Sequence, residues 1–214
     1  AYDVDSRDNT GVFAEYQGRF GAQQMQAGLR SDDNEQFGSH TTGNLGWGWH
    51  FDGGMLLSTR YSTGFRAPSF NDLYYPYYGN PELQPEESKS LNIGLSGELQ
   101  AWRWTLDVFE NRVDDLISFD SATFLPGNID TARLRGGELT VGTTLAGWDL
   151  AAQYSHVDPR NRSEGANRGK LLPRRARDTG RIDLDRDFGD FAFGTTLNAA
   201  GSRFDDAANL VRVG

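Results

Sequence analysis

The sequence contains no cysteine, so neither a disulfide scaffold nor a thiolate metal site is available to it. No uninterrupted apolar run reaches the length of about 18 residues that a membrane-spanning helix needs. The three histidines, His40, His50 and His156, are too scattered to suggest a metal site. The formal net charge of −9 argues against nucleic-acid binding. No nucleophile–base or acid–base set emerges either, so we expect neither an enzyme nor a cofactor.

Glycine and aromatic residues are abundant, with 26 glycines and 12% aromatics, and they follow an alternating pattern. In residues 42–51 the apolar positions are Leu45, Trp47, Trp49 and Phe51, and the positions between them are Asn44, Gly46, Gly48 and His50. In residues 101–111 the apolar set is Trp102, Trp104, Leu106 and Val108, opposed by Arg103, Thr105, Asp107 and Asn111. Side chains of a strand alternate between faces, so each segment has one apolar and one polar face.

This pattern predicts ten strands of about ten residues. They cover residues 10–20, 22–31, 42–51, 54–64, 88–98, 101–112, 131–145, 148–157, 177–187 and 190–203. Short turns alternate with long polar connections at residues 31–41, 65–87, 113–130, 158–176 and 204–214. Consecutive strands joined by tight turns pair antiparallel, so the predicted fold class is all-β, an antiparallel up-and-down meander.

Short turns at one end and long loops at the other are typical of an outer-membrane β-barrel wall. A soluble antiparallel sandwich also alternates, but it explains the tryptophan pairs and the unequal connections poorly. The barrel hypothesis places Trp47, Trp49, Trp102, Trp104, Leu106 and Val108 on one unusually exposed face, with Asn44, Arg103, Thr105 and Asp107 on the other. It also predicts unpaired edges at residues 10–20 and 191–203, because ten strands do not close a barrel of larger diameter.

Several sequence stretches resemble one family, in the same order along the chain. They are STGFRAPSFNDLY (62–74), GNPELQPE (79–86), NRVDDLI (111–117), NIDTARLRGGEL (128–139) and LLPRRA (171–176). Together they resemble the barrel of TonB-dependent outer-membrane receptors. RDNTGVF (7–13) and YSHVDPRNR (154–162) are most similar to the cobalamin receptor branch.

The resemblance implies part of a 22-stranded transmembrane barrel in the bacterial outer membrane. Residues 1–214 are then expected to form a partial β-barrel domain, roughly the tenth to the nineteenth strand, with the plug, the TonB-contacting segment and the last strands outside it. It implies import of cobalamin or another large metal chelate, with TonB and outer-membrane lipid as partners. A ferric-siderophore or haem receptor is the alternative within transport, and an adhesin or passive porin the alternative outside it.

The candidate ligand-binding residues lie in one predicted loop: Arg66, Asn71, Tyr74, Tyr75, Tyr77 and Tyr78. Arg66 follows a strand, and a role in fixing the base of the loop competes with ligand or plug contact. The tyrosines could offer an aromatic platform to a flat ligand such as a corrin. A self-packed cluster, or anchoring at the level of the lipid headgroups, is an equal alternative.

For two charged stretches the functional hypothesis is weaker than the structural one. Residues 32–35 (Asp-Asp-Asn-Glu) could hold a hard cation such as calcium, but a simple acidic turn is more common, and no metal site is assigned. Residues 160–177 are rich in arginine and could contact the phosphate of lipopolysaccharide, although a solvated loop is favoured.

Overall fold

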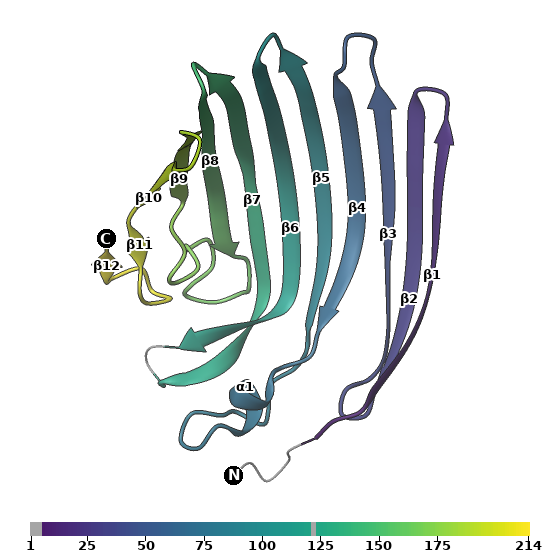
Figure 1. Cartoon of the computed structure of the whole chain (residues 1–214). Coiled ribbons are helices and arrows are strands. Elements are labelled where there is room, and N and C mark those ends of the chain that lie inside the picture. The colour runs from purple at the N-terminus through teal and green to yellow at the C-terminus, as the bar shows by residue number, and fades with distance from the viewer. Residues whose placement is uncertain (1–5, 121–122) are drawn as a thin grey trace.

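Ten strands follow one another across a single antiparallel sheet, and each pairs with its neighbours in sequence (Figure 1). The computed structural model describes residues 6–120 and 123–214. The strands are β1 (Asn9–Phe20), β2 (Gln23–Asn34), β3 (Gly38–His50), β4 (Leu56–Arg66), β5 (Glu86–Leu99), β6 (Trp102–Asp120), β7 (Leu125–Leu145), β8 (Trp148–Asn161), β9 (Asp178–Asp187) and β10 (Ala192–Ala200). The predicted all-β meander is confirmed.

The remaining elements are short. One helix, α1 (Phe70–Tyr74), lies between β4 and β5, and a small hairpin of β11 (Arg203–Phe204) and β12 (Arg212–Val213) follows β10. The hairpin falls in the predicted loop 204–214, which is therefore partly wrong. Within the described residues, none of the helical structure is long and apolar enough to cross a membrane.

The two ends of the sheet differ in their connections. At the end drawn uppermost in Figure 1, which we call the turn end, neighbouring strands are joined by tight turns. Ala146 and Gly147 have φ of 52° and 79°, as a two-residue type I′ hairpin requires. The opposite end, which we call the loop end, carries the two longer connections, residues 67–85 and 162–177.

The long connection predicted for residues 31–41 is wrong. β2 and β3 continue through most of it and leave only residues 35–37 between them. Asp33 pairs with Ser39, whose hydroxyl donates to the Asp33 carboxylate at 2.8 Å. Asp32 accepts from Arg30 at 2.6 Å. Acidic side chains do not stop a strand when its backbone is paired and its carboxylates have donors.

The loop predicted for residues 113–130 is also mostly strand. β6 runs on to Asp120 and β7 begins at Leu125, so this hairpin projects beyond its neighbours at the loop end (Figure 1). Burial explains the extension, because a small hydrophobic cluster stabilises it, made of Val113, Leu116, Ala132 and Leu172. Leu172 comes from residues 162–177, so the cluster joins that loop to the hairpin.

The strand register confirms the predicted division into two faces. One lateral row, on what we call the outer face, runs through Trp47, Thr59, Ile93 and Val108. A row on the opposite, inner face runs through Asn44, Ser62, Ser90 and Asn111. By alternation, Trp49, Trp102, Trp104 and Leu106 share the outer face, and Arg103, Thr105 and Asp107 share the inner one.

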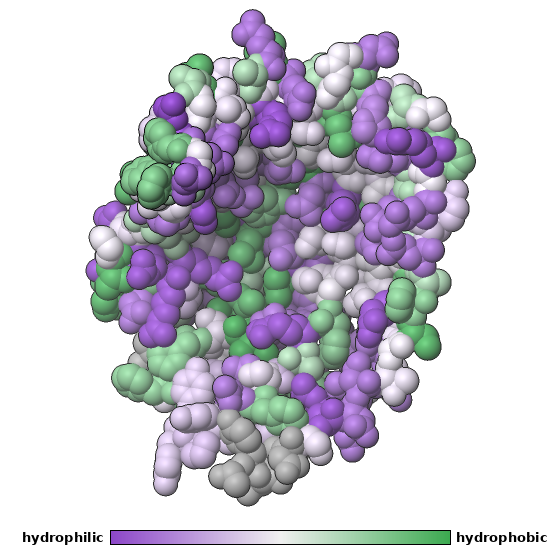
Figure 2. All heavy atoms as spheres, viewed as in Figure 1, coloured by the Kyte–Doolittle hydropathy of each residue, from purple (hydrophilic) through white to green (hydrophobic). Residues whose placement is uncertain are grey.

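The outer face is apolar and open. Leu106 and Val108 are 45% and 47% exposed, and Leu45 is 62% exposed. Side chains of this kind normally form a core, so a water-facing surface does not account for them. Figure 2 looks onto the other, inner face, where hydrophilic residues lie over the strands on the right and hydrophobic residues gather down the centre of the view.

Both margins of the sheet are open. In the described part of the chain β1 pairs only with β2, and β10 only with β9. The two margins do not pair with each other, so the sheet does not close, as predicted from its strand number.

Candidate functional site

The loop of residues 67–85 carries all of the candidate ligand residues except Arg66, which ends β4 directly before it. Its helix α1 begins with a capping box, in which the Ser69 hydroxyl accepts from the Asp72 amide at 3.2 Å and the Asp72 carboxylate accepts from the Ser69 amide at 3.0 Å. Leu73 and Leu83 are each only 1% exposed and form the small core of the loop. The loop is therefore a folded unit with its own packing.

Arg66 closes the base of this loop. It pairs across the sheet with Glu86, and both Glu86 carboxylate oxygens accept from its guanidinium, one of them at 2.8 Å from Nε. The same carboxylate accepts from the backbone amide of Ile117 at 2.8 Å. A bidentate pair of this kind fixes orientation, so Arg66 joins the start of the loop to its end and to β6.

The four tyrosines divide into two groups. Tyr75 is 52% exposed and Tyr77 fully exposed at the tip of the loop. Tyr78 stacks on Phe119, with ring centroids 6.2 Å apart and an interplanar angle of 10°. The hydroxyl of Tyr74 accepts from the Gln36 side chain at 2.7 Å. The Tyr75 ring also meets Tyr78 edge-on, with centroids 6.3 Å apart. Tyr77 and the exposed part of Tyr75 are therefore open to a ligand, and Tyr74 and Tyr78 attach the loop to the sheet.

Asn71 belongs to α1 and is exposed on the same loop. Its backbone carbonyl accepts from the Tyr75 amide at 3.4 Å, which ends the helix directly before the exposed tip. The loop therefore holds Asn71 and the four tyrosines in one folded segment, with Arg66 at its base.

Residues outside the predicted set hold this surface in place. Arg174 lies over the Phe119 ring, 4.4 Å from its centroid, so Tyr78, Phe119 and Arg174 form one stack. The side-chain amide of Asn128 donates to the Gln84 carbonyl at 3.0 Å and accepts from the Gln84 amide at 2.9 Å. Sequence reasoning missed these residues because it assigned both Phe119 and Asn128 to a loop.

A signal for Phe119 was present in the sequence. The apolar residues of Leu-Ile-Ser-Phe (116–119) are unusual in a solvated loop and favour a strand. No comparable local signal exists for Arg174, because its contact depends on how residues 162–177 fold back across the sheet.

The acidic run 32–35 is used by the fold. Asp32 pairs with Arg30, and the Glu35 carboxylate accepts from the backbone amide of Asp8 at 3.0 Å. Among residues 6–120 and 123–214, no group of three or more histidine, cysteine or carboxylate side chains could hold a metal ion.

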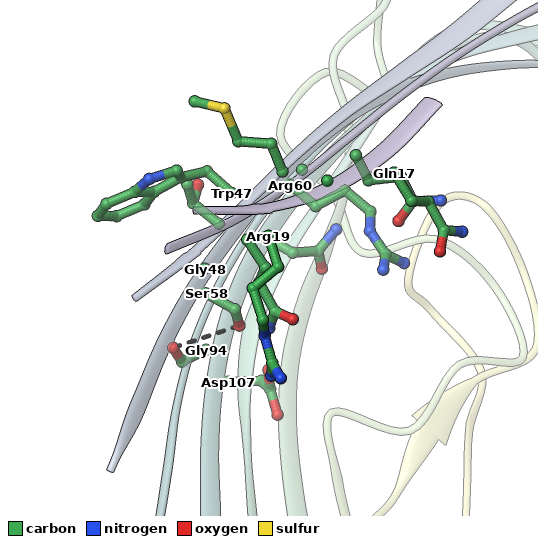
Figure 3. Close-up of a pocket in the computed structure, with 15 residues that line it drawn as sticks. Gln17, Arg19, Trp47, Gly48, Ser58, Arg60, Gly94 and Asp107 are labelled. Atoms are coloured by element: carbon green, nitrogen blue, oxygen red, sulfur yellow. Dashed lines mark hydrogen bonds between the residues drawn. The ribbon is translucent and has the colours of Figure 1, made fainter. Parts of the chain in front are cut away.

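The inner face carries a wide polar hollow of about 740 Å³ over β1–β6. Its polar side chains include Gln17, Arg19, Arg60 and Asp107. Figure 3 shows Trp47 on the opposite side of the sheet from Arg19, Arg60 and Gln17. A water-facing inner wall and an apolar outer wall are the arrangement of a membrane barrel.

The arginine-rich stretch 160–177 is tied into the structure rather than freely solvated. Arg160 donates to Asp158 at 2.8 Å and to the Gly169 carbonyl at 2.8 Å. Arg174 donates to Asp205 at 2.8 Å. The stretch therefore braces the loop end of the sheet.

Comparison with known proteins agrees with this geometry. A family model described as "TonB dependent receptor-like, beta-barrel" matches residues 1–214. The chain belongs to this family. TonB-dependent receptors are proteins of the Gram-negative outer membrane, so the ten strands are transmembrane wall and the outer face meets lipid.

Among sequence relatives of this receptor chain is the vitamin B12 transporter BtuB of Photobacterium profundum. The two are 32% identical over 219 residues, which cover 99% of this chain and 36% of that protein. The chain thus spans little more than a third of the length of this relative.

Solved structures of other receptors share the fold. The copper transporter OprC matches with a TM-score of 0.75 at 20% identity, covering 94% of this chain and 36% of that chain. The siderophore receptor PirA of Acinetobacter baumannii matches with a TM-score of 0.72 at 16% identity, covering 91% of this chain and 33% of that receptor. A mutant of the ferric enterobactin receptor PfeA of Pseudomonas aeruginosa matches with a TM-score of 0.75 at 19% identity, covering 96% and 34%. At these identities the likeness shows the fold alone.

Proposed function

We propose that this chain is barrel wall of a TonB-dependent active transporter that imports cobalamin. The observation that carries the proposal is the 32% identity to a vitamin B12 transporter along nearly the whole chain. The proposed role is transport, with no catalysis. TonB would act through a segment outside these 214 residues and use the energy of the inner membrane to release ligand.

In this proposal the loop of residues 67–85 contributes to the external ligand surface. Tyr75 and Tyr77 offer exposed rings that suit a broad, flat, partly apolar chelate such as a corrin. Tyr74 and Tyr78 hold the loop to its neighbours, Asn71 adds an amide beside the rings, and Arg66 fixes the base.

A ferric-siderophore or haem receptor is the second candidate, because siderophore receptors share this fold. Exposed aromatic rings also suit catecholate or porphyrin ligands, so the loop chemistry alone does not separate these substrates. The third candidate is a barrel that does not carry out active transport, such as an adhesin or a passive porin.

Binding by the full-length receptor separates these candidates. We expect saturable binding of cobalamin, measured by isothermal titration calorimetry in detergent, and none of ferric enterobactin or haem. Binding of either rival instead of cobalamin would reassign the substrate, and binding of none would favour a non-transporting barrel.

Substitution tests the loop directly. Tyr75→Ala with Tyr77→Ala should weaken cobalamin binding by about tenfold, the effect of losing one to two stacking contacts. Tyr61→Ala is the matched control, because Tyr61 is an exposed aromatic on the outer face of β4. Equal affinity in the double variant and the control would remove the tyrosine loop from the ligand site.

A further inference from the structure

A row of basic side chains crosses four neighbouring strands on the outer face. Lys89 of β5 pairs in register with Arg112 of β6, and Arg112 pairs with Arg133 of β7. Arg133 in turn pairs with Arg160 of β8. Arg112 lies an even number of residues from Val108, so the whole row shares the lipid-facing side. We call these four residues the cationic row.

The height of the row follows from strand geometry. Arg112 lies ten residues along β6 from Trp102, which sits on the outer face at the turn end. At about 3.3 Å per residue and a tilt of about 40°, ten residues rise about 25 Å along the membrane normal, the height of the apolar band of such barrels. Trp102 at one boundary therefore places Arg112 at the other, on the loop side. Long loops of outer-membrane barrels are extracellular, so the row lies at the headgroups of the outer leaflet.

Part of the row's charge is balanced by protein carboxylates. Arg112 donates to Glu110 at 3.0 Å, and Arg160 donates to Asp158 at 2.8 Å. Asp158 is shared further, since Arg177 also approaches it at 3.6 Å. The acidic partners here are fewer than the arginines around them.

The other two members, Lys89 and Arg133, are less closely balanced by carboxylates. Within residues 6–120 and 123–214, no carboxylate lies at salt-bridge distance from Lys89 or Arg133. The buried Nε of Arg133 has no hydrogen-bond partner in that part of the chain. Arg112, Arg135 and Arg162 add positive charge around the Arg133 guanidinium, and Glu110 offsets part of it. Glu87 and Asp114, which pair with each other, lie in the next row of this face on the loop side, so the cations outnumber the carboxylates around them without being free of them. Like charges held close together favour a bound anion.

A groove of about 550 Å³ runs along the outer face directly beside the row, with an apolar part and an end of mixed charge that includes Glu110 and Asp158. Leu91, Ile93 and Val108 supply apolar walls, and Arg135 lines the end toward the row. Gly137 lies between Val108 and His156 in the register, so no side chain fills the face at that point. Positive charge toward the loop end and apolar walls toward the turn end match a lipid that carries phosphate on its headgroup.

We propose that the cationic row binds phosphate groups of lipopolysaccharide, the acylated and phosphorylated saccharolipid of the outer leaflet, and that the groove takes one of its acyl chains. Guanidinium groups bind phosphate oxygens in bidentate fashion, and neighbouring strands present several of them side by side. The proposal rests on the membrane orientation of the proposed transporter and is independent of which ligand is carried.

Titration of the delipidated full-length receptor, followed by native mass spectrometry, tests the lipid chemistry without any substitution. We expect lipid A to bind at least about tenfold more tightly than dephosphorylated lipid A or phosphatidylglycerol. Equal binding of the dephosphorylated form would overturn a phosphate site. Equal binding of phosphatidylglycerol would overturn lipopolysaccharide as the occupant.

A triple variant tests the residues. Lys89→Gln, Arg112→Gln and Arg133→Gln together should lower co-purified lipopolysaccharide at least about tenfold. The control variant removes three positive charges elsewhere, with Arg103→Gln, Arg168→Gln and Arg186→Gln. It should keep the lipopolysaccharide content of the unaltered receptor. Wild-type lipopolysaccharide content in the row variant would refute the proposal.

Two further measurements keep the result interpretable. Heat-modifiable migration in gels reports whether each variant is folded. If the row variant does not fold, the lipid titration of the unaltered receptor alone decides whether the phosphate site exists. Cobalamin binding should be the same in both triple variants as in the unaltered receptor. If the unaltered receptor and both variants all failed to bind cobalamin, the proposed substrate would be wrong, while the lipid result would stand.

Discussion

At the scale of single residues, the loop of residues 67–85 depends on a glycine that leaves no room for a side chain. Gly79 packs against the end of α1, and a Cβ there would lie 2.5 Å from the Leu73 carbonyl oxygen. The clash is with backbone, which does not move aside as a flexible side chain does. Arg66 shows a different dependence, since its guanidinium is committed to Glu86. The sequence offered two roles for this arginine, fixing the base of the loop and contact with ligand or plug, and the structure shows the contact with Glu86 that serves the first.

We predict that Gly79→Ala loosens residues 67–85 by about 1–3 kcal/mol, the usual cost of forcing extra atoms into a packed site. Hydrogen–deuterium exchange of the full-length receptor should show faster exchange in α1 and the tyrosine tip. Gly127→Ala is the control, because nothing lies within 4 Å of a Cβ at that position. Identical exchange in the two variants would contradict the packing argument.

A second residue-scale prediction concerns pH. Backbone amide donors at Val211 (2.7 Å) and Leu210 (2.9 Å) lower the pKa of the Asp206 carboxyl. Its folded pKa lies below the unfolded value of about 4, so its stabilising effect is present above pH 4 and is lost as pH falls through the folded pKa.

Protection factors of the Leu210 and Val211 amides, corrected for intrinsic exchange, should therefore drop as the pH falls below about 4. In Asp206→Asn the drop should be absent, because the amide oxygen does not titrate. A drop of equal size in this variant would assign the effect to another group.

At the scale of elements, alternation decides what a strand position tolerates. Leu106 faces lipid and Thr105, the neighbouring residue, faces the polar interior. An ion placed in hydrocarbon has no partner to replace its water, whereas the inner wall is hydrated. The same change of residue should therefore have very different costs at the two positions.

We predict that Leu106→Arg destabilises the receptor by about 2–4 kcal/mol and that Thr105→Arg has a much smaller effect. Denaturant unfolding of the full-length protein in lipid vesicles measures both. A larger loss for Thr105→Arg would reverse the assignment of faces.

At the scale of the whole molecule, the described sheet has two open margins. β1 and β10 each present one edge whose backbone groups have no neighbouring strand. Such edges pair readily with other chains, and the exposed apolar outer face adds a second cause of association.

The 214 residues expressed alone and refolded in detergent should therefore form a mixture of oligomers through strand edges. Multi-angle light scattering should detect species larger than one chain, increasing with protein concentration. A monodisperse monomer would show that the edges close or are protected in solution.

Much of this protein follows from its sequence. Alternation with period two sets which side chains of a strand share a face, so the faces of Trp47, Trp102 and Asp107 were predictable without coordinates. The family motifs lie within short stretches, so they too could be recognised locally. The ends of the strands were less predictable, because β2, β3, β6 and β7 extend past the alternating segments into residues that look like loops.

Only the tertiary structure decided the contacts between distant segments. Tyr78, Phe119 and Arg174 meet because the β6–β7 hairpin projects and residues 162–177 fold back onto it. The cationic row exists because lateral register aligns Lys89 and Arg133 with neighbours on other strands. Register depends on turn geometry and on pairing across the whole sheet, and one residue of slip would turn each of these side chains to the opposite face.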